Sequence, residues 1–400
     1  MTTSAQQIRN WTGPAILSYG YRPFFLLATI WAALAMAVWV FMLAGRAPLP
    51  VSMDPVSWHA HGLLFGYGWA VIAGFLMTAV PNWTGRFPIV GWPLAGLVVL
   101  WLAGRLAMSV SGLLPGWLVV GTDLAFPVVL SAAIVREIVA GKNWRNLRVM
   151  VVLAILLVAN AGYHAEAATG YAAGGYSARA ALAALVMLIA LIGGRIVPSF
   201  TRNWLAARKS PVLPAPLGRG DIGVMAVSVV ALAGWVIWPG EMLVGALCLL
   251  AAVANLWRLA RWQGARCLSE PLVWVLHTGY LFVPLGFAVV GLAAMGIGAE
   301  SAAKHLWMAG AVGLMTLAVM TRASLGHSGL PLTAGVGVSS IYLALIASVL
   351  ARFAAGWWPG AVWLTHLAAA GWIAAMAGFA VLYWPILTQP KTATKRANAR

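Results

Sequence analysis

The chain of 400 residues is 62% hydrophobic and only 8% charged, and its formal net charge is +17. Soluble domains carry about 25% charged residues, so this composition excludes a water-soluble protein. Apolar runs of about 20 residues recur along the whole length, which predicts membrane-spanning helices and not a β-barrel. The two cysteines, Cys248 and Cys267, form no CxxC or CxxCH motif, so neither an iron–sulfur cluster nor a c-type haem is indicated.

The apolar runs predict an all-α polytopic membrane protein with about twelve transmembrane helices in a single domain, residues 1–400. In chain order, the expected spans are 24–44, 57–80, 93–112, 115–139, 147–168, 177–200, 221–239, 242–260, 271–297, 302–324, 332–354 and 359–384. Residues 1–20 and 388–400 are expected to be short tails. Because residues 1–20 are polar and mixed, no signal peptide is predicted.

The basic residues divide unequally between the two sides of the membrane. Of the 25 lysines and arginines, 20 fall on the side of the N-terminus, Arg105 lies inside a span, and four lie on the opposite side: Arg46, Arg179, Lys304 and Arg352. The positive-inside rule then places both termini in the cytoplasm. The positive charge is therefore expected to contact membrane lipid headgroups, and no nucleic-acid partner is predicted.

A weak internal repeat links helices 2, 6 and 10. Glycine follows both His61 and His305 at +5, and a Thr-Gly or Ser-Gly pair follows at +23 and +24. The sixth helix ends in VPSFTRNW, which is related to VPNWTGRF at the end of the second. Since these helices are four apart, the pattern favours three four-helix units. The alternative is chance similarity among spans rich in glycine, alanine and leucine.

Five of the seven histidines are expected near the outer side. His59, His61, His305 and His366 lie in the first turns of helices that enter from outside, and His164 lies near the outer end of the fifth helix. An ionisable group in a bilayer costs several kcal/mol, so each is a candidate for function. Imidazoles suit copper and haem iron, and we predict that these five are metal or haem ligands. The alternative is that each only bridges helices through hydrogen bonds.

His59 and His61 are two residues apart in the stretch WHAHGLLFG. At about 100° per residue, their side chains point about 200° apart on a helix. They cannot both ligate one ion from a regular helix, so we expect them to do different jobs. The alternative is that one of them sits in a frayed helix start.

A second polar group is expected at the inner side, at the ends of helices 6 and 10 and early in helix 9. Arginines slightly within a bilayer can pair with haem propionates, a quinone carbonyl or lipid phosphate. The predicted cofactor-binding residues there are His277, His327, Arg195, Arg322, Asn203 and Tyr280. The alternative, a positive-inside anchor, suits Arg202 better than Arg195. No catalytic residue is assigned.

Arg105 and Asp123 are the remaining charges inside spans. They lie eight residues before and nine residues after the turn at Leu113–Leu114, so they are expected at equal depth. This arrangement predicts a structural ion pair. A proton relay is the alternative.

Several motifs together resemble the NnrS family of bacterial membrane proteins. They are GYRPFF (Gly20–Phe25), WHAHGLLFG, GFLMTAVPNWTG, GGRIVPSFTRNWL, LHTGY and TRASLGHSG, and they cover nearly the whole chain in order. The resemblance implies haem b and copper, and a link to the bacterial response to nitric oxide. One departure is Gly62, which stands where the family pattern leads us to expect an acid after the second histidine of WHAH.

The resemblance implies a protein of the bacterial cytoplasmic (inner) membrane that handles nitric oxide in denitrification or nitrosative stress. The corresponding activity would be that of an oxidoreductase, a quinol-linked nitric oxide reductase, with quinol as electron donor. Two alternatives remain open. The first is a sensor or scavenger that binds nitric oxide without turnover. The second is a secondary transporter, a class in which twelve helices and internal repeats are common.

Overall fold

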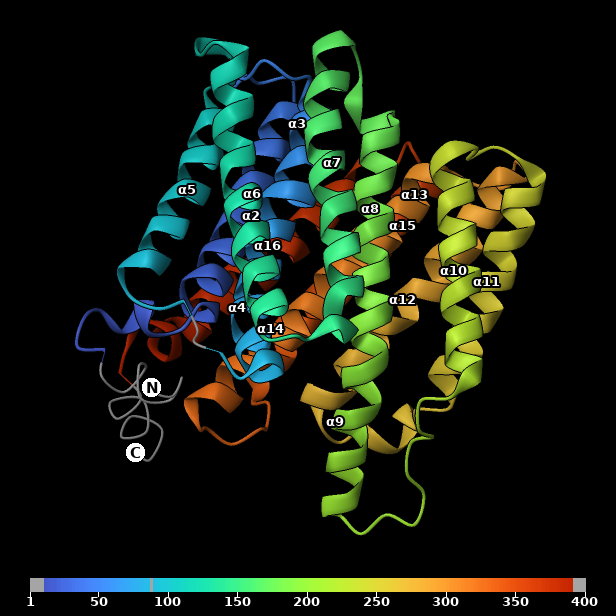
Figure 1. The fold of residues 1–400 in the computed structure, drawn as a ribbon. Coiled ribbons are helices and arrows are strands. Elements are labelled where there is room, and N and C mark those ends of the chain that lie inside the picture. The colour runs from blue at the N-terminus through green and yellow to red at the C-terminus, as the bar shows by residue number, and fades with distance from the viewer. Residues whose placement is uncertain (1–10, 87–88, 391–400) are drawn as a thin grey trace. The chain divides into compact units, whose positions relative to one another are not determined.

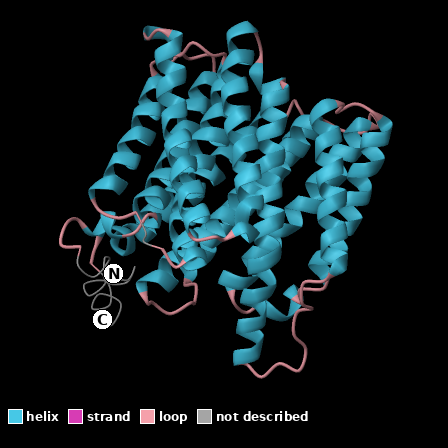
Figure 2. Cartoon of the chain, viewed as in Figure 1, coloured by secondary structure: helices cyan, strands magenta, loops and turns pink. Residues whose placement is uncertain are grey.

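Each predicted apolar run folds into a membrane-length helix. The computed structural model describes residues 11–86 and 89–390. Within them, twelve helices are long and apolar enough to cross a membrane, and Figure 2 shows these residues as helices joined by loops, without a strand. The prediction of an all-α protein with about twelve spans is confirmed. Of the expected tails, residues 1–10 and 391–400 lie outside the described residues.

The observed bounds agree with the predicted ones to within a few residues in most spans. In chain order the spans are α2 (Tyr21–Leu43), α3–η2–α4 (Pro55–Thr84), α5 (Trp92–Ser109), α6 (Gly116–Ala140), α7 (Leu147–Thr169), α8–η6–α9 (Tyr176–Ala207), α10 (Arg219–Ile237), α11 (Met242–Ala260), α12 (Pro271–Ala294), α13–η8–α14 (Glu300–Ser328), α15 (Val336–Trp357) and α16 (Val362–Thr388). Large apolar side chains along them, such as Leu106, Val158 and Val381, are exposed and therefore contact lipid.

Three of the described spans change from α- to π-helical winding. The π-helical stretches are η2 (Gly62–Tyr67), η6 (Ile189–Gly193) and η8 (Leu306–Leu314). They fall in spans 2, 6 and 10, which are the three spans that the sequence repeat connects. π-Helical turns are rare in proteins, and those that occur are often found at functional sites. Their recurrence every four spans agrees with the expected three four-helix units.

The chain also divides into two compact units. Unit 1 takes its described residues from Met1–Ala181, Ala323–Pro331 and Phe379–Arg400, and unit 2 takes its residues from Leu182–Arg322 and Leu332–Gly378. The two compact units therefore do not coincide with the three four-helix units that the sequence repeat favours. The expectation of a single transmembrane domain stays a prediction.

The helices of unit 1 that matter for function pack closely, and α3 begins with a defined cap. α6 packs against α5, α4 and α7 (Figure 1). α3 (Pro55–His61) begins with proline in its first turn, and the Asp54 carboxylate accepts a hydrogen bond from the Ser57 backbone N–H at 2.9 Å. The buried Trp58 donates from Nε1 to the Met108 carbonyl at 3.2 Å. These contacts fix the start of the span that carries both histidines of WHAH.

Candidate metal centre

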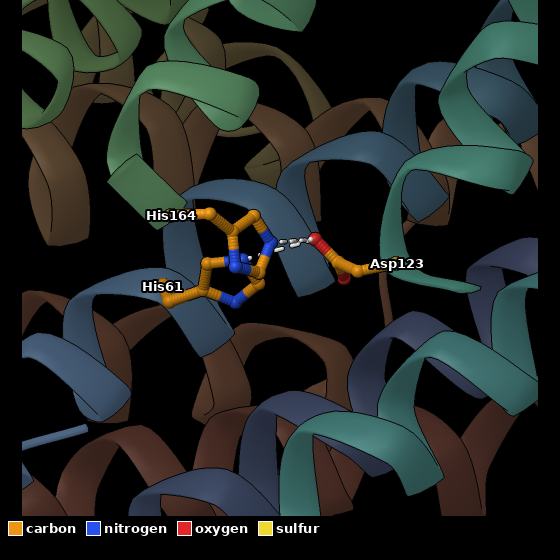
Figure 3. Close-up of side chains that lie close together, drawn as sticks. All are labelled: His61, Asp123 and His164. Carbon is orange, nitrogen blue, oxygen red and sulfur yellow. Dashed lines mark hydrogen bonds and ion pairs between the residues drawn. The ribbon is translucent and has the colours of Figure 1, made fainter. Parts of the chain in front are cut away.

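Three buried side chains from three helices of unit 1 converge on one point. His61 is the last residue of α3, Asp123 lies in α6 and His164 lies in α7 (Figure 3). The Asp123 Oδ2 atom is 3.1 Å from His61 Nε2 and 3.0 Å from His164 Nε2. One ligand atom from each residue lies within 4.8 Å of the others, and all three residues are buried. We call these three residues the triad.

The position of His61 is fixed by the π-helical stretch that starts at the next residue. Within η2, the Gly62 carbonyl accepts a hydrogen bond from the Trp31 indole N–H at 2.8 Å. The Gly66 carbonyl accepts one from the Trp101 indole at 3.0 Å. Buried backbone carbonyls need such partners, so the two indoles stabilise the π-helical winding. They therefore support the orientation of His61 without contacting its ring nitrogens.

Arg105 in α5 holds the other oxygen of the Asp123 carboxylate. Its Nη2 donates to Asp123 Oδ1 in a buried ion pair, which confirms the predicted pairing. The guanidinium lies 5.7 Å and 5.9 Å from the ring centroids of Trp31 and Trp101. Its Nε and Nη1 atoms have no hydrogen-bond partner among the described residues. Because Arg105 offsets the charge of Asp123, the carboxylate stays available to His61 and His164 at low electrostatic cost.

Asn160 lies one turn before His164 on the same face of α7. Its Oδ1 atom is 3.2 Å from His61 Nε2, and its side chain is buried. Two oxygen atoms, from Asp123 and Asn160, therefore face a single nitrogen of His61.

Two imidazole nitrogens and one carboxylate oxygen fit a single transition-metal ion. Two histidines with one carboxylate are a known set for non-haem iron, and imidazole also suits copper and zinc. Without a metal, each ring can donate its Nε2–H to Asp123 Oδ2. A metal ion would take the place of these two protons at Nε2, and each neutral ring would then carry its proton on Nδ1.

The triad does not fit haem as a pair of axial ligands. A macrocycle would have to lie between His61 and His164, but the Asp123 oxygen occupies that space, 3.1 Å and 3.0 Å from the two Nε2 atoms.

A comparison with known families assigns the chain. The family model described as NnrS protein matches residues 15–391, which is nearly the whole chain. The chain belongs to the NnrS family. NnrS membership fits a nitric-oxide-related membrane protein, as the motifs predicted, and the whole triad lies within the matched residues. Among curated proteins, none matches the sequence significantly.

In this NnrS protein, His59 and His61 have different surroundings. The His59 ring stacks on Trp39 with ring centroids 4.6 Å apart and planes 21° apart, and it is half-buried. His61 instead meets Asp123, His164 and Asn160. The two rings do serve different partners, as the helical spacing predicted, and His59 does not belong to the triad.

Of the five outer histidines predicted as ligands, the structure brings His61 and His164 together. His305 and His366 belong to unit 2. The His305 Nδ1–H donates to the Ser301 carbonyl of its own helix at 2.7 Å, and His366 is exposed.

The residues predicted as an inner cofactor group divide between the two units. In unit 1, the His327 ring is 5.5 Å from the Tyr21 ring. In unit 2, His277 Nε2 is 2.8 Å from the Thr201 hydroxyl, and the Arg322 guanidinium lies 4.2 Å from the centroid of the Phe200 ring. Asn203 is exposed and Arg195 is half-buried.

Tyr280 belongs to a second buried network, also in unit 2. Its hydroxyl accepts from Arg258 Nη1 at 3.0 Å and donates to Asn255 Oδ1 at 2.8 Å. Arg258 Nε donates to Asp221 Oδ1 at 2.9 Å, and its Nη1 also donates to the Ala190 carbonyl at 2.9 Å. This carbonyl lies in the π-helical stretch η6.

Sequence reasoning missed Asp123 as a member of the triad, and Asn160 as its neighbour. Asp123 was expected only as the partner of Arg105, because residue counting gives its depth and not the direction of its second oxygen. For Asn160, the spacing of four residues from His164 is a signal that could have found it.

Proposed function

We propose that this NnrS protein binds nitric oxide at a transition-metal centre held by His61, Asp123 and His164, and reduces it. The observation that carries the proposal is the convergence of two imidazoles and a carboxylate in the membrane-spanning part of unit 1. Family membership supports the choice of nitric oxide. Nitric oxide is small and uncharged, so it reaches a buried site through the bilayer without a polar channel.

We propose copper as the metal, because the family resemblance implies it and because copper accepts mixed nitrogen and oxygen donors. Iron is the alternative that metal analysis separates. A redox-active ion supplies single-electron transfer and a binding position for nitric oxide. Any haem b of this protein would be held elsewhere than between His61 and His164.

The reaction consumes two nitric oxide molecules, two electrons and two protons, and yields nitrous oxide and water. A quinol can supply both electrons and both protons, and it becomes a quinone. The protein's own residues would do three things: Asp123 and the two imidazoles hold the ion, Arg105 offsets the carboxylate charge, and the surrounding apolar helices exclude water.

We further propose the bacterial cytoplasmic membrane as the location, with both termini in the cytoplasm. The support is the division of basic residues, 20 on one side against four on the other. Reporter fusions at both ends would test the orientation. A periplasmic terminus would contradict it and would place the triad toward the opposite side of the membrane.

The test uses the full chain, purified in detergent, with metal analysis and a nitric oxide electrode. We expect about one copper or iron ion per chain and nitrous oxide formation with a reduced quinol analogue. His61→Ala should lose the metal ion and the formation of nitrous oxide, whereas His59→Ala should keep the metal ion. Nitric oxide binding without nitrous oxide would support the scavenger instead. Absence of a redox metal from the wild-type protein would overturn the proposal.

A further inference from the structure

Asn160 places a fourth donor atom beside the triad, from a side chain that is 1% exposed. We propose that its amide oxygen is a fourth, displaceable ligand of the metal, and that nitric oxide binds by taking its place. This inference rests on the proposed function and adds how substrate enters the centre.

The spacing of the donor atoms matches one coordination sphere. Two metal–ligand bonds of about 2.1 Å at a right angle put their donor atoms about 3.0 Å apart, and a tetrahedral angle gives about 3.4 Å. The three distances His61 Nε2 to Asp123 Oδ2, His164 Nε2 to Asp123 Oδ2, and His61 Nε2 to Asn160 Oδ1 are 3.1, 3.0 and 3.2 Å. Asn160 Oδ1 therefore lies as far from His61 Nε2 as a second ligand of the same ion would.

The hydrogen-bond balance also favours a cation. His61 Nε2 can offer one hydrogen, yet Asp123 Oδ2 and Asn160 Oδ1 both approach it, and Oδ2 must also serve His164. At His61 Nε2, two acceptor oxygens thus face a single hydrogen. A metal ion bonds to all four atoms at once, which resolves the excess without moving a helix.

The neighbours of Asn160 explain why it would be the ligand that leaves. Asp123 is anchored through its other oxygen by Arg105, and His61 is fixed between α3 and the π-helical stretch. A neutral amide oxygen is a weaker ligand than an imidazole or a carboxylate. Nitric oxide would therefore displace Asn160 and leave the triad in place.

Cobalt(II) gives a direct readout, because its visible spectrum reports the number and type of its ligands. The full-length protein would be loaded with cobalt as wild type, Asn160→Leu, Asn160→Ser and Asn160→Asp. Thr122→Val is the matched control: it removes a polar group next to Asp123 whose hydroxyl bonds only the Leu118 carbonyl among the described residues. Size-exclusion profiles would verify folding, and Asn160→Ser serves if the leucine variant does not fold.

We expect Asn160→Leu and Asn160→Ser to retain cobalt with shifted visible bands, and Thr122→Val to match wild type. With the native metal, the leucine variant should bind nitric oxide at least about tenfold more tightly, and Asn160→Asp at least about tenfold more weakly. Unchanged bands and affinities would overturn the role of Asn160 while the triad stands. A wild-type protein that binds neither cobalt nor a native metal would overturn both proposals.

Discussion

Two buried arginine–aspartate pairs, Arg105–Asp123 in unit 1 and Arg258–Asp221 in unit 2, share several features. Each lies on a pair of adjacent spans that follows a span with a π-helical stretch. Each guanidinium lies over tryptophan, 5.5 Å from the Trp262 centroid in unit 2. Each guanidinium also lies close to a glycine in or next to the π-helical stretch, Gly66 in unit 1 and Gly194 in unit 2.

The pairs differ in what the carboxylate does next. The second oxygen of Asp221 accepts from Arg261 Nη1 at 3.1 Å and from the Gly218 N–H at 2.9 Å, so it completes the N-terminal cap of α10. The second oxygen of Asp123 faces two imidazoles. A buried ion pair therefore becomes a candidate site when its spare oxygen meets groups whose protons a metal can replace.

The largest effect should come from Asp123→Leu, because it leaves the Arg105 charge buried without a partner. We expect a loss of about 3–5 kcal/mol in unfolding free energy, together with loss of the metal. The double variant Arg105→Leu/Asp123→Leu should recover much of the stability and none of the metal. Thermal unfolding in detergent and metal analysis measure both. A double variant as unstable as the single one would contradict the ion-pair account and favour the proton relay.

His61→Ala and His59→Ala separate the two histidines of WHAH. Removing a residue that hydrogen-bonds to a metal ligand lowers the metal affinity about 10–100-fold. Removing the ligand His61 itself should therefore lower the metal affinity by more than this. His59→Ala should leave the affinity within a few-fold of wild type and remove only its stacking on Trp39. Metal competition titrations measure the difference. Equal losses in the two variants would mean that both rings serve one centre.

Arg258→Met tests whether the unit 2 pair is structural. We expect a loss of about 1.5–3 kcal/mol, the usual contribution of a hydrogen bond to a charged group. The loss should be smaller than for Asp123→Leu because Arg261 and the Gly218 N–H still hold Asp221. Metal content should not change. A fall in metal content with the fold intact would show that unit 2 also contributes to the centre.

Gly66→Ala and Gly194→Ala give a smaller, matched pair of changes. A Cβ at Gly66 would lie 2.5 Å from Arg105 Nη1, and one at Gly194 would clash with Arg258 Nη2. Both should lower unfolding free energy by about 1–3 kcal/mol through overpacking. Gly66→Ala should also weaken metal binding, since it displaces the arginine that anchors Asp123. If the two variants bind metal equally well, the link from Arg105 to the centre is wrong.

The sequence predicted the features that depend on local counting. Twelve apolar runs gave twelve spans, the turn at Leu113–Leu114 gave the partnership of Arg105 and Asp123, and the helical period separated His59 from His61. Each follows from distance along the chain or angle around one helix.

The features that it could not predict depend on how helices rotate against one another. The π-helical stretch after His61 changes which face of the helix the following residues occupy. No residue pattern in the sequence predicted this change of winding. The sequence predicts five histidines at a similar depth in the membrane. Only the contacts between helices show that His164, Asp123 and Asn160 are the residues that meet His61.

X-ray absorption at the metal edge of the loaded full-length protein tests the central claim most directly. The expected result is one ion with two imidazole ligands and oxygen neighbours at about 2.0–2.2 Å, and no such ion in His164→Ala. An ion without imidazole neighbours, or a spectrum that His164→Ala leaves unchanged, would contradict the metal centre.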